Sequence, residues 1–200
     1  MNSMIKMVVC FLSVIFSIGI TATPLLTIKW IGFENSLYLM YILELILGIV
    51  ISFFIYKGEW KLGDNKIFFK CLLLIILIQT AVCMVLDGSI KSLQFSTDYI
   101  LPFLVVICFV PFYEECIYRG CLIDVFHHFF KDGLVLPIVL SSVIFSGMHA
   151  QYSGILDYVV LFFISLILSF ARVKSGSLLP SILLHSLMNT FVLVLNTLLK

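Results

Sequence analysis

The chain has 200 residues, of which 62% are hydrophobic and only 12% are charged, and its mean hydropathy is +1.20. A soluble domain carries about 25% charged residues, so this composition indicates an integral membrane protein. The formal net charge of +1 excludes the strongly basic balance of nucleic-acid-binding proteins, and we expect no nucleic-acid partner. The cysteines occur singly and mostly inside apolar runs, so they predict apolar packing residues and not a disulfide framework.

The apolar runs predict an all-α, polytopic transmembrane helix bundle. A bilayer core of about 30 Å takes about 20 apolar residues per helix, which gives about seven spans for this chain. The predicted spans, in chain order, are Met4–Leu26, Leu37–Tyr56, Ile67–Leu86, Tyr99–Tyr118, Leu134–His149, Ile155–Arg172 and Ser177–Leu199. We interpret the first as a retained helix, although Lys6 and the sequence Thr21-Ala22-Thr23 are also compatible with a signal peptide.

The chain shows no soluble domain, long linker or internal repeat, so we predict one integral-membrane domain with the active site inside the bundle. Residues 1–98 would form three helices without a recognisable motif, and residues 99–200 would form the catalytic core. Between the fourth and fifth spans, Gly120–Gly133 alternates polar and aromatic residues, a pattern typical of an amphipathic interfacial helix. His127 and His128 are adjacent and point to different faces, so we expect them to be solvated and not to act as ligands.

Basic residues predict the orientation of the bundle. Apart from Arg119, eight lie on the same side as the N-terminus and three on the other, by the predicted spans. The eight are Lys6, Lys57, Lys61, Lys66, Lys70, Lys131, Arg172 and Lys174, and the three are Lys29, Lys91 and Lys200. The positive-inside rule therefore places the N-terminus in the cytoplasm.

Charged residues interrupt the fourth span at Pro111–Gly120, where ionisable groups are costly. If Pro111 starts a helical turn, Glu115 and Arg119 are i,i+4 neighbours and can pair. Glu114 points about 100° away and lacks that partner. We therefore expect Arg119 to neutralise Glu115 and to leave Glu114 free for chemistry.

Two further polar clusters lie inside apolar runs, with His149 at the end of the fifth span and His185 and Asn189 in the seventh. His185 and Asn189 are i,i+4 and share one face. With Glu114 they could converge on one water or metal. Glu114, His149 and His185 would suit Zn²⁺ or another divalent metal. Without metal, Glu114 assisted by His149 would take a proton from water, while His185 and Asn189 stabilised an oxyanion.

The three motifs Glu-Glu-x-x-x-Arg, Phe-x-x-x-His and His-x-x-x-Asn, in this order, resemble those of the CPBP family of intramembrane peptidases. That family includes type 2 CAAX prenyl proteases and bacterial Abi proteins for bacteriocin processing and self-immunity. The resemblance implies catalytic roles for Glu114, Glu115, Arg119, His149, His185 and Asn189. It implies a metal-dependent or glutamate-type peptidase that acts on a peptide or membrane-protein substrate in the lipid bilayer. The absence of eukaryotic sorting signals and the compact length favour a bacterial plasma membrane.

Two other classes of function stay open. Intramembrane Glu, His and Arg residues also build the relays of ion-coupled transporters, although such proteins usually show repeats or dispersed charges. A non-catalytic immunity or scaffold protein could also retain the motif residues. The soluble-metalloprotease motif H-E-x-x-H and the serine elbow G-x-S-x-G are both absent from the sequence.

Overall fold

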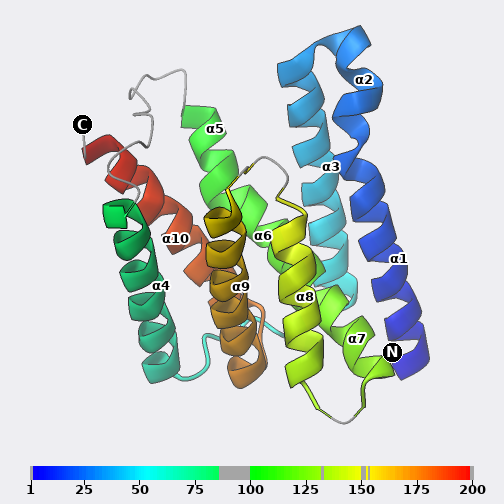
Figure 1. The fold of residues 1–200 in the computed structure, drawn as a ribbon. Helices are drawn as coiled ribbons and strands as arrows, with labels where there is room; N and C mark the ends of the chain where they lie inside the picture. The colour runs from blue at the N-terminus through cyan, green and yellow to red at the C-terminus, as the bar shows by residue number, and fades with distance from the viewer. Residues whose placement is uncertain (1, 86–99, 132, 150–151, 153, 199–200) are drawn as a thin grey trace.

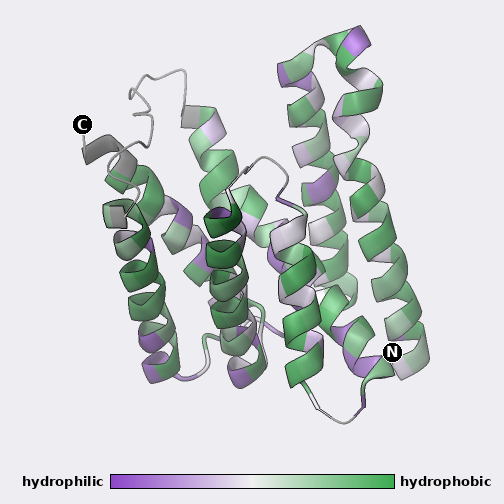
Figure 2. Cartoon of the chain, in the orientation of Figure 1, coloured by the Kyte–Doolittle hydropathy of each residue, from purple (hydrophilic) through white to green (hydrophobic). Residues whose placement is uncertain are grey.

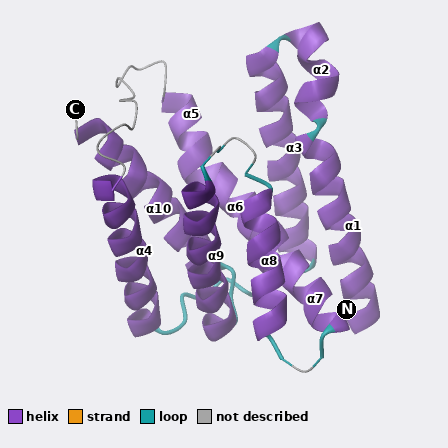
Figure 3. Cartoon of the chain, viewed as in Figure 1, coloured by secondary structure: helices purple, strands orange, loops and turns teal. Residues whose placement is uncertain are grey.

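The computed structural model describes residues 2–85, 100–131, 133–149, 152 and 154–198, and every regular element in these ranges is helical (Figure 3). The elements are α1 (Ser3–Thr21), α2 (Thr23–Ile31), α3 (Phe33–Phe54), α4 (Asn65–Val85), α5 (Ile100–Leu104), the π-helix η2 (Val105–Phe109), α6 (Val110–Glu114), the π-helix η3 (Glu115–Leu122), α7 (Ile123–Phe129), α8 (Val135–Gly147), α9 (Ile155–Ser175) and α10 (Leu179–Leu198). The all-α prediction is confirmed.

The helices run up and down through one bundle, with the two termini at opposite ends (Figure 1). Five helical stretches of the described chain are long and apolar enough to cross a membrane: Ser3–Ile31, Phe33–Phe54, Asn65–Met84, Leu101–Phe129 and Ile155–Ser175. Two further apolar helices, Val135–Gly147 and Leu179–Leu195, are shorter. The outward faces carry mainly apolar residues, and polar residues gather at the end that carries the N-terminus (Figure 2). The protein is therefore a multi-pass membrane protein.

Helix α8 is too short to cross a bilayer. Its 13 residues extend about 20 Å at the rise of an α-helix, against a hydrocarbon core of about 30 Å. The chain leaves helical geometry after Gly147, so His149 lies beyond the end of α8 and not in its last turn. Non-helical backbone at membrane depth is tolerated only where protein buries it or where it lines a cavity. The early end of α8 thus leaves His149, which is half-buried, in the non-helical backbone that follows the helix.

The motif helix runs further than the predicted span Tyr99–Tyr118 at its C-terminal end. Residues 100–129 form one helical run, and Pro111 lies in the first turn of the α6 segment of this run. The segment Gly120–Gly133 does not form a separate interfacial helix, because η3 and α7 continue the run to Phe129. Gly120, Ile123 and Val125 are buried against neighbouring helices. The alternation of polar and aromatic residues arises because one face of η3 and α7 packs against neighbouring helices, while the C-terminal end of α7 is exposed to solvent.

The N-terminal helices pack directly against this motif helix. A Cβ atom on Gly48 of α3 would lie 2.9 Å from the Cβ of Tyr113, and one on Gly120 would lie 2.7 Å from the Tyr56 ring. Small residues at these two positions let the backbones approach closely, as is common between membrane helices. Cys10 of α1 and Cys116 of η3 belong to the same buried apolar cluster. Helices α1 and α3 of the N-terminal part therefore contribute to the core around the motif.

Candidate active site

Glu115 and Arg119 form a buried ion pair on η3. Arg119 Nη1 lies 3.2 Å from Glu115 Oε1, and both side chains are fully buried. This confirms the predicted i,i+4 pairing. Arg119 also donates from Nη2 to Ser165 Oγ of α9 at 2.9 Å, and its guanidinium lies 4.1 Å from the ring centroid of Phe145 on α8. The arginine thus joins the motif helix to two neighbouring helices and neutralises Glu115.

His185 of α10 contacts both carboxylates of the motif. Its Nδ1 lies 2.8 Å from Glu115 Oε1, across 70 residues of sequence. Glu115 is paired with Arg119 and is an acceptor, so His185 Nδ1 carries the hydrogen and donates it. The other ring nitrogen, Nε2, then faces Glu114 and lies 3.9 Å from Glu114 Oε2. Glu115 therefore orients the imidazole and leaves Nε2 available to Glu114.

Glu114 is the motif carboxylate without a charge partner of its own. Its Oε2 atom is buried and accepts no hydrogen bond from any described residue. Such orphaned buried oxygens are rare and usually have a functional reason. The separation from His185 Nε2 is too long for a direct hydrogen bond but allows one water to contact both atoms. A carboxylate and an imidazole so arranged can hold a water and remove its proton.

His149 has a different environment from His185. Its Nδ1 lies 2.7 Å from the carbonyl oxygen of Phe145, and its ring packs on Phe145 with centroids 4.5 Å apart and stacks on Tyr152 at 6.3 Å. The Phe145 ring also contacts His185, with centroids 6.1 Å apart. Among the described residues, a contact within 4 Å joins His185, and not His149, to Glu114. His149 lies near enough to act on Glu114 electrostatically.

Asn189 lies one turn beyond His185 on α10, and it also faces the motif helix. Its Nδ2 donates to the carbonyl oxygen of Val106 in η2 at 2.8 Å. The predicted shared face of His185 and Asn189 is therefore confirmed. The Asn189 amide, expected to serve an oxyanion, already uses one of its two N–H groups on the backbone.

The expected metal ligands do not form a ready ligand set. No group of three His, Cys, Asp or Glu side chains within the described residues has the geometry to hold a metal ion. Glu114 and His185 approach each other, whereas His149 packs against Phe145 and Tyr152. A catalytic zinc site needs three protein ligands, so the arrangement does not fit one without movement of His149.

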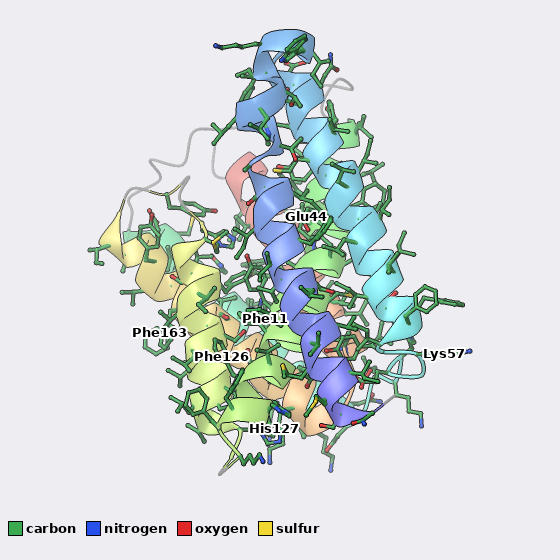
Figure 4. The ribbon with its side chains drawn as sticks, turned by 90° about the vertical axis from the view of Figure 1, so that its right-hand side faces the viewer. Phe11, Glu44, Lys57, Phe126, His127 and Phe163 are labelled. Carbon is green, nitrogen blue, oxygen red and sulfur yellow. The ribbon has the colours of Figure 1, made fainter. Side chains whose placement is uncertain are left out.

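A further buried acid, Glu44 of α3, was not anticipated from the sequence. It is fully buried, and Ser17 of α1 donates to its two carboxylate oxygens at 2.9 and 3.1 Å. Figure 4 shows Glu44 far from Lys57 and His127, which mark the polar end of the bundle. Its neighbours include Tyr113, the residue before Glu114. An acid in the middle of an apolar run is itself a signal of a functional site, and it could have been found by that rule.

The fold and this cluster define a membrane-embedded helical protein with a buried Glu–Glu–Arg–His constellation. Residues 96–191 match the model of the family described as type II CAAX prenyl endopeptidase Rce1-like. This part of the chain is therefore similar to the Rce1-like family, and the match supports the resemblance to CPBP peptidases. The family is one of intramembrane CAAX-type endopeptidases.

One curated relative is an Escherichia coli protein described as an uncharacterized 24.3 kDa protein, which is 36% identical over 88 residues. The alignment covers 44% of this chain and 41% of that relative, so the chain matches less than half of the relative's length. No solved structure matches the chain.

Proposed function

We propose that this protein is an intramembrane endopeptidase that hydrolyses a peptide bond of a membrane-associated peptide or protein. The observation that carries the proposal is the unpartnered, buried Oε2 of Glu114, 3.9 Å from the free nitrogen of an imidazole that Glu115 orients. The family match supports the peptidase class. CAAX-type, bacteriocin-processing and self-immunity substrates all remain compatible with this chemistry.

The proposed reaction uses one water. Glu114 removes a proton from the water, with His185 Nε2 holding the same water, and the water oxygen bonds to the carbonyl carbon of the scissile peptide. The peptide C–N bond then breaks, and the proton held by Glu114 passes to the departing amine. Glu115 and Arg119 act only by fixing His185. No step in this scheme needs a metal ion.

The decisive experiment compares membranes that contain the wild type with membranes that contain Glu114→Gln. Glutamine has the shape of glutamate but cannot take the proton, so we expect cleavage to fall by at least ~10²–10⁴-fold with normal protein levels. Mass spectrometry of the released peptides measures both the substrate and the loss. Glu34→Gln is the matched control, because Glu34 is exposed at the start of α3. Equal cleavage by Glu114→Gln and wild type would remove the peptidase assignment from this site.

Metal content distinguishes the two versions of the chemistry. If Glu114, His149 and His185 are ligands, purified protein should hold near-stoichiometric Zn²⁺ or another divalent ion, and the double His→Ala variant should lose it. A chelator should then stop cleavage. Full activity in metal-free protein would favour the glutamate–histidine water mechanism.

A further inference from the structure

In the hydrogen-bond register of η2, the carbonyl oxygen of Val106 has no backbone donor. In η2 the hydrogen bonds run five residues back, as shown by the bond from the Val110 amide to the Val105 carbonyl. The next amide in this register belongs to residue 111, which is a proline without an N–H. The Asn189 side chain donates to Val106 in its place, at 2.8 Å.

An unpaired carbonyl is costly at this position because lipid offers no donor. Prolines inside membrane helices are tolerated where a neighbouring helix supplies the missing hydrogen bond. Here the donor comes from 83 residues further along the chain. The second π-helix has a similar arrangement. At its end, the Ile123 amide bonds to Gly120, and Ser141 Oγ of α8 donates to the Tyr118 carbonyl at 2.8 Å.

We infer that Asn189 is a positioning residue that replaces the backbone donor missing at Pro111 and so fixes the turn that carries Glu114. Glu114 lies three residues after Pro111, and His185 lies one helical turn before Asn189. The bond from Asn189 to Val106 therefore ties α10 to the motif helix beside the Glu114–His185 contact. The part of this inference that concerns catalysis rests on the proposed function. The part that concerns folding is independent of it.

A cycle of variants tests this role: Asn189→Ala, Pro111→Ala and the double variant. Alanine at 111 restores an N–H that can bond to Val106, so the loss of Asn189 should matter less in that background. Leaving a carbonyl unpaired where no water can bond to it shifts the folding equilibrium by ~5- to 150-fold. We expect Asn189→Ala to show such a loss with proline at 111, and only about a twofold change with alanine, the scatter of independent substitutions. Thermal unfolding in detergent measures the loss of folding, and cleavage by the same proteins should follow it.

Pro102→Ala is the matched control, because Pro102 lies in the same helical run, within α5 and outside η2. It should not reduce the cost of Asn189→Ala. An equal cost of Asn189→Ala in all three backgrounds would overturn the inference, and a loss confined to cleavage would identify Asn189 as an oxyanion donor instead. If Pro111→Ala does not fold, the stability of the variant Asn189→Asp tests the inference instead. It keeps the shape without the N–H, and wild-type stability of this variant would overturn the proposal.

The unfolding cycle also separates this inference from the proposed function. If the wild type cleaves nothing, the peptidase assignment fails, and the unfolding measurements still test the hydrogen bond. If Glu114→Gln abolishes cleavage while Asn189→Ala unfolds like the wild type, the assignment stands and the positioning role fails.

Discussion

Arg119 is a buried charged residue, and its contribution to stability depends on the groups around it. Its side chain pairs with Glu115, donates to Ser165 and lies over the Phe145 ring. Removing one member of a buried ion pair strands the other, which typically costs ~3–5 kcal/mol. We expect Arg119→Ala to lower the amount of folded protein strongly, as measured by size-exclusion chromatography of the detergent-solubilised protein.

Lys29→Ala is the control for Arg119→Ala, since Lys29 is an exposed cation on α2. It should leave the folded amount unchanged. Normal accumulation of Arg119→Ala, with full cleavage, would contradict the role of Arg119 in holding Glu115 and His185.

For the Ser17–Glu44 pair, we expect a second substitution to restore stability that the first one removes. Ser17→Ala removes the hydroxyl that donates to both oxygens of a fully buried carboxylate, and it should destabilise the protein by ~1–3 kcal/mol. Replacing both partners by apolar groups of similar size can be nearly neutral. We therefore expect Ser17→Ala with Glu44→Leu to unfold at a higher temperature than Ser17→Ala alone. A double variant less stable than the single one would show that Glu44 has further partners that it needs.

Contacts between residues close in sequence could be predicted, whereas contacts between residues far apart in sequence could not. The Glu115–Arg119 pair was predictable because both residues belong to one helix, where spacing fixes direction. The contact of His185 with Glu115 spans 70 residues and depends on how two helices are rotated, which spacing does not determine. For that reason the sequence pointed to His149 as the partner of Glu114, whereas the described contact is made by His185.

At the scale of the elements, the long helices were predictable and their irregularities were not. Runs of apolar residues locate the spans, because the bilayer thickness sets their length. The π-helix η2 adjoins Pro111 and receives a hydrogen bond from α10, and α8, which ends early, packs against α9. Both features combine distant segments, so no local pattern indicates them. They are also the features that shape the site.

The loop between α3 and α4 is held to the turn between α9 and α10, and this contact predicts a stability effect. Ser177 Oγ donates to the Glu59 carbonyl at 2.6 Å and accepts from the Lys61 amide at 3.0 Å, while Arg172 lies 2.5 Å from the Glu59 carboxylate. Ser177→Ala should lower the free energy of unfolding by ~1–3 kcal/mol, because the Lys61 amide loses its acceptor and the Glu59 carbonyl keeps only the longer bond from the Leu178 amide, at 3.3 Å. Thermal unfolding measures the change.

Ser175→Ala is the control for Ser177→Ala, because the Ser175 hydroxyl donates only to carbonyls of its own turn, those of Arg172 and Ser177. It should cost less than Ser177→Ala. Equal losses would mean that the turn after α9, and not its contact with the loop, determines stability.

For the whole molecule, the distribution of charge and the path of the chain agree. The described members of the predicted cytoplasmic set lie at the end of the bundle that carries the N-terminus, where Figure 2 shows the polar residues gathering. Lys29 lies on α2, at the opposite end (Figure 1). The prediction for Lys91 and Lys200 falls outside the described residues. The bundle therefore has one strongly basic end, as the positive-inside rule requires of a cytoplasmic face.

Reporter fusions test this orientation. An alkaline phosphatase fusion is active only outside the cytoplasm, and a fluorescent-protein fusion folds only inside it. Fusions in the Lys57–Lys66 loop and after Lys174 should give fluorescence and no phosphatase activity, because the positive-inside rule predicts that the end with eight basic residues, against three on the other side, faces the cytoplasm. A fusion after Trp30, near the turn at Gly32, should give the reverse result. Phosphatase activity at both basic loops would invert the bundle, and would place the Glu114–His185 pair in a protein whose C-terminus, not its N-terminus, lies in the cytoplasm.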